Sequence, residues 1–295
     1  MTENELYNFT DKTLREVQLK GLEMLLYFKD FCDANNLLFY LCGGCCIGAI
    51  RHKGFIPWDD DIDIFMPRDD YERLAILWNE KADTNKYSYC RPSEKVNYRN
   101  LFATINDNNT TFIKTQQADL DINHGLVLDI LPLDGYPNSK IKRNIQFFWA
   151  LTYSIFCAQV APTNHGKFIN VLGKAILKTF KTQKVRYKIW NFAEKQMKKH
   201  KISDCDNVTE LCSGITYMKN KYPKNIFKEA THKEFEGYNV PIPIGFDEYL
   251  KIAFGNYLEM PPKEKQYPHH YVVFCDLNNS YKKYKGKYYF KEETK

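Results

Sequence analysis

The pattern of hydrophobic and polar positions predicts a helix, a strand and a glycine turn in the first fifty residues. From Thr13 to about Asp33, apolar residues recur every three or four positions, as on one face of an amphipathic helix, and Thr13 and Glu16 fit a capping box at its start. The apolar run Leu37–Leu41 predicts a buried strand that leads directly into Gly43-Gly44. Residues 45–50 predict a short helix, whose free N–H groups beside the glycine pair would face a bound phosphate.

A second pattern, the alternation of charged and apolar residues, occurs in the stretch Gly54–Arg68. Asp61 and Asp63 flank Ile62, and because successive strand residues point to opposite faces, we expect both carboxylates on one side of a strand. Their Cα atoms would lie roughly 6.6 Å apart. Two carboxylates so close repel each other, so the pair predicts a site for Mg²⁺ or Mn²⁺. A glycine turn followed by such a strand is what metal-assisted phosphoryl or nucleotidyl transfer requires.

A third carboxylate is expected from the apolar run Gly125–Pro132, which contains Asp129. A charge inside a buried strand is costly unless it is paired. Asp129 therefore either completes the metal site or bonds to a backbone group or to a cation elsewhere. The following pair, Asp134-Gly135, predicts a turn that lies close enough to contribute to the site.

The middle of the chain differs from the rest in charge. Residues 140–201 contain fourteen Lys and Arg and one acid, Glu194, which gives this segment a formal charge of +13 and leaves −7 for the remainder. The apolar run from Phe147 to Ala161 is too short to predict a membrane-spanning helix. Two interpretations stay open: a helical subdomain with solvated basic faces, or helices that rest on an anionic membrane surface.

Composition limits the remaining possibilities. The chain has 295 residues, of which 44% are hydrophobic, and this content indicates a globular protein rather than disorder. Nine cysteines, an odd number, together with a polar, acidic N-terminus predict reduced thiols and a cytoplasmic protein. Cys42 and Cys45 have CxxC spacing, which fits small buried residues beside a turn better than a metal or redox site. The Lys- and Tyr-rich residues 281–295 predict a surface tail.

Three blocks of sequence resemble the LicD family. The first contains Gly43-Gly44 and continues through Gly48-Ala-Ile-Arg-His-Lys-Gly-Phe-Ile-Pro-Trp-Asp-Asp-Asp-Ile-Asp63 to Met66-Pro-Arg68 and Asp70-Tyr71. The second is Leu128-Asp-Ile-Leu-Pro-Leu-Asp-Gly135. The third comprises Val240–Pro243, Tyr249-Leu250, Phe254–Tyr257 and Pro261-Pro262.

The resemblance implies an α+β fold, with a nucleotidyltransferase-like mixed sheet flanked by helices and a basic helical insertion. We expect a catalytic core in residues 1–139, a basic helical segment in 140–205, and a C-terminal part in 206–295 that completes the domain. Members of this family move phosphocholine from CDP-choline onto bacterial surface glycans or teichoic acid precursors, and the fukutin-related branch moves ribitol phosphate from CDP-ribitol. The resemblance thus implies a metal-dependent phosphotransferase with a CDP-alcohol donor and a glycan or lipid-linked glycan acceptor.

The resemblance and the residues together predict the site. Asp61, Asp63 and Asp129 are expected to be catalytic and to hold Mg²⁺ or Mn²⁺. Substrate contacts are expected from the glycine turn, the basic residues that follow it, two further acids and a histidine pair that needs a turn to act jointly: Gly43, Gly44, Arg51, His52, Lys53, Asp60, Asp134, His269 and His270. Cys45 stands where the family often has Thr or Ser, and Thr104 and Asn106 where it carries basic residues, so the donor is expected to bind in a different way.

Other functions remain open from the sequence. A CDP-ribitol or CDP-glycerol donor is one alternative, and nucleotidyl transfer from an NTP is another. A silent relative that binds membrane or glycan through residues 140–201 is a third, although all three acids are present. No nucleic-acid partner is predicted, and membrane contact would place the protein at the inner face of the membrane.

Overall fold

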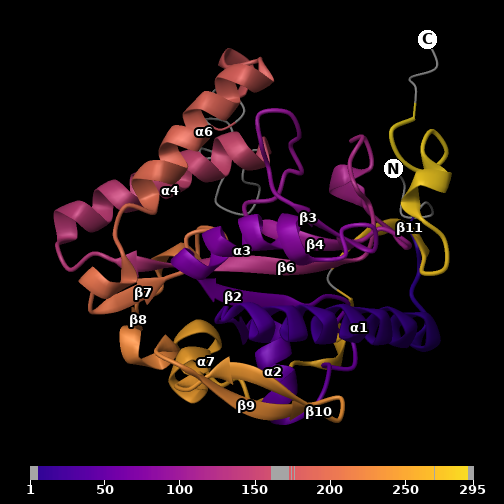
Figure 1. Cartoon of the computed structure of the whole chain (residues 1–295), viewed down its shortest axis with the longest axis horizontal. Coiled ribbons are helices and arrows are strands. Elements are labelled where there is room, and N and C mark those ends of the chain that lie inside the picture. Colours follow the sequence, from indigo (N-terminus) through magenta and orange to yellow (C-terminus); the bar gives the residue numbers. More distant parts are fainter. Residues whose placement is uncertain (1–5, 161–172, 174, 176, 269, 292–295) are drawn as a thin grey trace.

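The computed structural model describes residues 6–160, 173, 175, 177–268 and 270–291 (Figure 1). The helices are α1 (Asp11–Asn35), α2 (Gly43–Arg51), α3 (Arg68–Lys81), α4 (Lys140–Ala158), α6 (Gln183–Met197) and α7 (Phe246–Phe254). The strands are β1 (Tyr40–Leu41), β2 (Asp63–Pro67), β3 (Tyr87–Cys90), β4 (Ala103–Asp107), β5 (Thr111–Lys114), β6 (Val127–Tyr136), β7 (Asn207–Thr209), β8 (Tyr222–Pro223), β9 (Ala230–Phe235), β10 (Tyr238–Pro243) and β11 (Val272–Asp276).

A mixed sheet forms the centre of the fold. Its strands follow the order β1-β2-β6-β4-β3, and β7 and β8 extend it beside the last residues of β6. Strands β2 and β6 run parallel, whereas the other neighbours are antiparallel. Two further pairs, β9–β10 and β5–β11, lie outside this sheet. The mixed sheet and its helices confirm the predicted α+β class.

The N-terminal helix begins earlier than its pattern predicts. Thr10 caps α1, because its side chain accepts a hydrogen bond from the Thr13 N–H while the Thr13 hydroxyl accepts one from the Thr10 N–H. The predicted box at Thr13 and Glu16 is therefore wrong. The apolar face of α1 packs into the main core, where Phe28 and Phe31 meet the buried ring of Trp78 from α3.

Helices α4 and α6 form a pair at one end of the molecule, away from α7 and the β9–β10 hairpin (Figure 1). They enclose a second, smaller core around Ala150, Tyr153, Trp190 and Met197. This pair confirms the predicted basic helical segment in its described part; the division of the chain at residues 139 and 205 stays a prediction.

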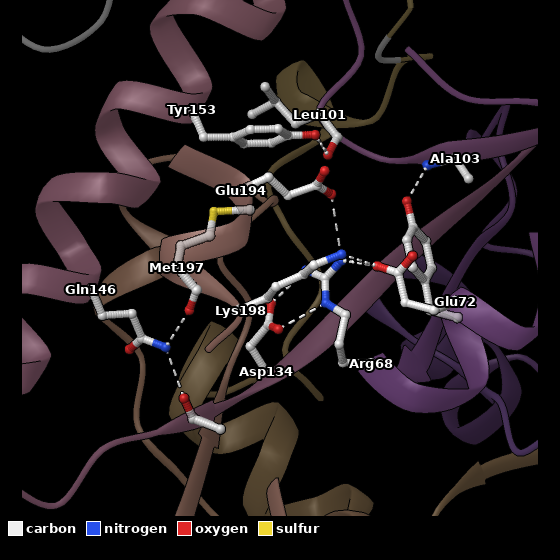
Figure 2. Close-up of polar contacts among 12 residues, drawn as sticks. Arg68, Glu72, Leu101, Ala103, Asp134, Gln146, Tyr153, Glu194, Met197 and Lys198 are labelled. Carbon is white, nitrogen blue, oxygen red and sulfur yellow. Dashed lines mark hydrogen bonds and ion pairs between the residues drawn. The ribbon is translucent and has the colours of Figure 1, made fainter. Parts of the chain in front are cut away.

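A buried ionic cluster joins this helix pair to the central sheet (Figure 2). Arg68 donates two hydrogen bonds to Asp134, with distances of 2.8 and 2.7 Å. Glu194 of α6 accepts a hydrogen bond of 2.5 Å from Arg91, and Glu72 accepts from Arg91, Lys198 and Arg68. Although burial acts the other way, these cations lower the pKa of Glu72 to about 2.

Two local predictions fail for the same reason, that partners distant in sequence override the local pattern. Asp134 and Gly135 lie inside β6 rather than in a turn, because β7 pairs with this end of β6 and Arg68 neutralises Asp134. Residues 281–291, the described part of the predicted surface tail, are partly packed into the protein. Tyr284 and Tyr289 are buried against Ile113 and Ala118.

Candidate active site

The site begins with the pairing of two parallel strands. Asp63, the first residue of β2, lies directly opposite Asp129 of β6. Asp61 precedes the strand instead of belonging to it, but the Asp129 N–H donates to the Ile62 carbonyl at 2.9 Å and so continues the ladder. Ile62 is buried while its two neighbours line the same cavity. The predicted arrangement of Asp61, Asp63 and Asp129 on one side is therefore present.

These acids line a cavity of about 710 Å³. Its described wall carries six carboxylates and three basic side chains: Asp59, Asp61, Asp63, Asp129, Glu210 and Glu259, with Arg51, Lys265 and His270. The remaining wall is rich in aromatic rings, among them Tyr217, Tyr249 and Phe254. The cavity thus combines concentrated negative charge with flat apolar surfaces.

The glycine pair allows the backbone to approach the acids closely. Gly43 has φ = +52°, a conformation that other residues rarely adopt, and it begins α2 directly after β1. A Cβ on Gly44 would lie 2.4 Å from Asp59 Oδ2, so any larger residue here would displace this carboxylate. The Gly43 N–H donates to the Tyr249 hydroxyl at 3.0 Å, which fixes the turn against α7. Both glycines line the cavity, as the sequence predicts for a phosphate-binding turn.

The carboxylates are crowded and short of partners. Burial, together with the neighbouring Asp61 and Asp129, raises the pKa of Asp63 well above its usual range. Burial and the Asp61 carboxylate do the same to the pKa of Asp59. Asp129 Oδ1 and Asp59 Oδ2 are buried and have no hydrogen-bond partner among the described residues. Oxygen ligands with unbalanced charge are what Mg²⁺ and Mn²⁺ take, so these residues fit a divalent cation.

Two basic residues complete the cluster. Lys114 of β5 is buried, with its Nζ 3.8 Å from Asp129 Oδ2 and 3.2 Å from His270 Nε2. The ring of His270 contacts Asp60 through Nδ1 at 3.1 Å, and its backbone N–H also bonds this carboxylate. Among the described residues, Asp60, Asp61 and His270 form the group whose possible ligand atoms all lie within 4.8 Å of one another, so Asp63 and Asp129 would have to approach Asp61 more closely to share one ion with it. Sequence reasoning did not single out Lys114, because a lone lysine at a strand end carries no signal.

The other predicted residues are placed as follows. Arg51 lines the cavity and donates to the backbone carbonyls of Tyr257 and Glu259. His52 accepts from Arg51, and Lys53 is exposed and pairs with Glu234 at 3.4 Å; neither is among the described residues of the cavity wall. Asp134 lies in the buried pair with Arg68. His269 lies outside the described residues.

Comparison with known proteins agrees with this geometry. Residues 36–171 match the family described as LicD/FKTN/FKRP, nucleotidyltransferase domain. The protein named lipopolysaccharide cholinephosphotransferase LicD, from Haemophilus influenzae, is 33% identical over 270 residues, which cover 88% of this chain and 96% of that protein. Mannosyltransferase regulator 4 of Saccharomyces cerevisiae is 26% identical over 145 residues, which cover 45% of this chain and 12% of that protein. A relative this similar over nearly its whole length carries the assignment: the chain belongs to the LicD family.

Proposed function

We propose that this chain transfers phosphocholine from a CDP-linked donor to a hydroxyl of a cell-surface glycan or of its lipid-linked precursor. As a member of the LicD family the chain is a phosphotransferase. The observation that carries the proposal is the register of β2 and β6, which sets Asp63 opposite Asp129 beside the glycine turn. The name of the Haemophilus influenzae relative, a lipopolysaccharide cholinephosphotransferase, supports both phosphocholine and a glycolipid acceptor.

The acids of the cavity would have two roles, to hold the metal and to accept a proton from the acceptor. Asp61 and Asp63, with Asp129 as a third ligand, would hold Mg²⁺ or Mn²⁺, whose positive charge would offset the negative charge that develops on the donor phosphates. Asp129 is also positioned to accept the proton of the acceptor hydroxyl, because its Oδ1 has no partner among the described residues. Arg51 in the cavity wall would neutralise the departing CMP.

Recognition of a quaternary ammonium group is supported by Glu210. This residue follows β7, is buried, and lines the cavity. Its described partners are neutral: it accepts hydrogen bonds from the Tyr222 hydroxyl and the Asn220 amide. Two further rings of the cavity wall, Tyr217 and Phe254, lie with their centroids 6.0 Å apart. A buried carboxylate without a cationic partner, next to exposed aromatic faces, suits the choline end of the donor.

We expect Glu210→Gln to raise the KM for CDP-choline about tenfold, since a loss of about 1.4 kcal/mol of binding corresponds to a factor of ten. The KM for CDP-glycerol, whose alcohol is neutral, should stay within about twofold. Glu259→Gln is a matched control, because Glu259 lines the same cavity but is exposed and bonded to Asn256. Equal losses for both donors would contradict a cation-binding role.

The same residue gives the reaction a pH dependence. Burial raises the pKa of Glu210 to about 7, while hydrogen bonds from Tyr222, Ser213 and Asn220 act in the opposite direction. Only the ionised carboxylate attracts a cation, so the affinity for CDP-choline should fall as the pH drops from 8 to 6. Titratable neighbours are Tyr217, Tyr222, Tyr249 and Cys42, whose pKa values burial raises. They stay neutral over this range. Because Asp59 and Asp63 in the same cavity also have raised pKa values, the quantity to measure is the ratio of the KM for CDP-choline to the KM for CDP-glycerol, and Glu210→Gln should remove the dependence of this ratio on pH.

The whole proposal is tested by offering the purified chain Mg²⁺, a glycan acceptor and a panel of donors. CMP release and a mass increase of the acceptor are expected with CDP-choline, and both should stop with EDTA and return with added Mg²⁺. Preferential turnover of CDP-ribitol or CDP-glycerol would change the donor. Consumption of an NTP with release of pyrophosphate would instead establish a nucleotidyltransferase.

A further inference from the structure

The outward face of α4 is apolar although nothing in the described structure covers it. Ile141, Ile145 and Phe148 have exposed fractions of 74%, 53% and 58%. Their spacing places them along one stripe of the helix, continued by Thr152 and Ile155. Ala150, Tyr153 and Cys157 lie on the opposite, buried side. Helix α4 therefore has apolar residues on both faces, whereas a helix with one side in water needs them only on its buried face.

The neighbouring helix α6 adds lysines to this face. Phe192 is exposed and meets Trp149 of α4 edge-to-face, with ring centroids 5.2 Å apart. Lys188 and Lys195 share the helical face of Phe192 and are exposed, and Lys199 is exposed in the turn that follows the end of α6. The apolar stripe of α4 and the basic face of α6 thus adjoin through one aromatic contact.

The basic residues in the first turns of α4 and α6 do not stabilise these helices. Lys140 and Lys142 lie in the first turn of α4, and Lys184 and Arg186 in the first turn of α6, where the helix macrodipole favours acids. Residues 140–201 contain a single acid, Glu194, which is buried against Arg91. Arg186 has a structural role, because it donates hydrogen bonds to the carbonyls of Leu177 and Phe180. The macrodipole does not account for the three lysines.

We propose that the stripe Ile141, Ile145 and Phe148, together with Lys188, Lys195 and Lys199, docks the protein onto an anionic membrane surface. An amphipathic face with large apolar residues and lysines lies in the plane of the lipid headgroups, and its lysines are drawn to acidic lipids. Among the described residues no helix is long and apolar enough to cross a membrane. The buried cluster around Arg68 and Glu194 fixes α6 to the catalytic sheet, so docking would hold the active site at a set orientation to the surface (Figure 2). This inference does not depend on the transfer reaction.

Sedimentation of the full-length chain with vesicles tests the proposal. We expect binding to phosphatidylcholine vesicles that contain 30% phosphatidylglycerol, at least tenfold weaker binding to pure phosphatidylcholine, and a loss of binding as NaCl rises from 0.1 to 0.5 M. Ile141→Gln combined with Ile145→Gln and Phe148→Gln should weaken binding at least tenfold. Lys188→Gln with Lys195→Gln and Lys199→Gln should remove most of its salt dependence.

The matched control is Ile76→Gln on α3, which removes an exposed apolar residue (62% exposed) from another surface and should leave binding unchanged. Because all the altered side chains are exposed, thermal unfolding of each variant should match that of the parent. The proposal is overturned if the parent does not sediment with the acidic vesicles, or if the triple α4 variant binds them as well as the parent. It is also overturned if light scattering shows a dimer that the α4 variant dissociates, since a second copy would then cover the stripe.

Discussion

Asp63→Asn is expected to lower turnover of the CDP-linked donor by about 10³-fold or more. The charge stabilisation that a bound metal supplies is worth several kcal/mol, and each 1.4 kcal/mol corresponds to about a factor of ten in rate. Asp63 faces Asp129 across the strand pair and lies beside the glycine turn, where a donor phosphate would bind. The measurement is the initial rate of CMP release at saturating Mg²⁺.

The thermal stability of the same variant separates lost catalysis from lost folding. Burial and the neighbouring acids raise the pKa of Asp63, which means that its charge opposes folding at neutral pH. The neutral amide should therefore leave the melting temperature equal to or above that of the parent when metal is absent. Asp33→Asn, which alters an exposed ion pair with Lys29, should change neither rate nor stability. Full turnover by Asp63→Asn would refute the role assigned to this carboxylate.

Arg68→Leu is expected to lower the free energy of unfolding by about 3–5 kcal/mol, because it leaves the Asp134 carboxylate buried without its cation. The two side chains are 9% and 0% exposed, and their contact is bidentate. Urea denaturation followed by circular dichroism measures the change. Arg73→Leu removes an exposed partner of Asp70 and should cost no more than about 1 kcal/mol.

A double variant decides whether the pair or the packing matters. Arg68→Leu with Asp134→Leu removes both charges, so it should recover most of the stability that the single change loses. If Arg68→Leu alone unfolds at the same urea concentration as the parent, the ionic cluster does not hold α6 to the sheet.

The parts of the site that the sequence predicts are those with a local pattern. Asp61-Ile62-Asp63 has strand alternation, Gly43-Gly44 stands between an apolar run and a small-residue helix, and Asp129 interrupts a buried run. Each signal is contained in one short continuous stretch of sequence, and the structure brings all three into one cavity. The mixed sheet and the basic helical segment are predictable for the same reason.

The remaining parts depend on pairing across long distances. Lys114 and His270 meet because β5 pairs with β11, 156 residues apart in the chain. The proposed role of Glu210 follows only from the aromatic residues that line the same cavity in the folded protein. Arg68 belongs to the block that resembles the family signature, yet its guanidinium is used in a buried ion pair with Asp134. Local composition carries no information about such partners.

The parallel pairing of β2 and β6 has a consequence for how this protein tolerates changes in length. Asp63 and Asp129 are far apart in the chain, but their spacing is set by the pairing of two adjacent strands, in which they are direct partners. Insertions in the loop between β3 and β4 should therefore leave the distance between the two carboxylates unchanged. A single inserted residue between Val127 and Asp129 would have the opposite result, because a shift of one position turns every later side chain of β6 to the other face of the sheet. The spacing of the two carboxylates is thus insensitive to the length of this loop but sensitive to a single residue inserted inside β6.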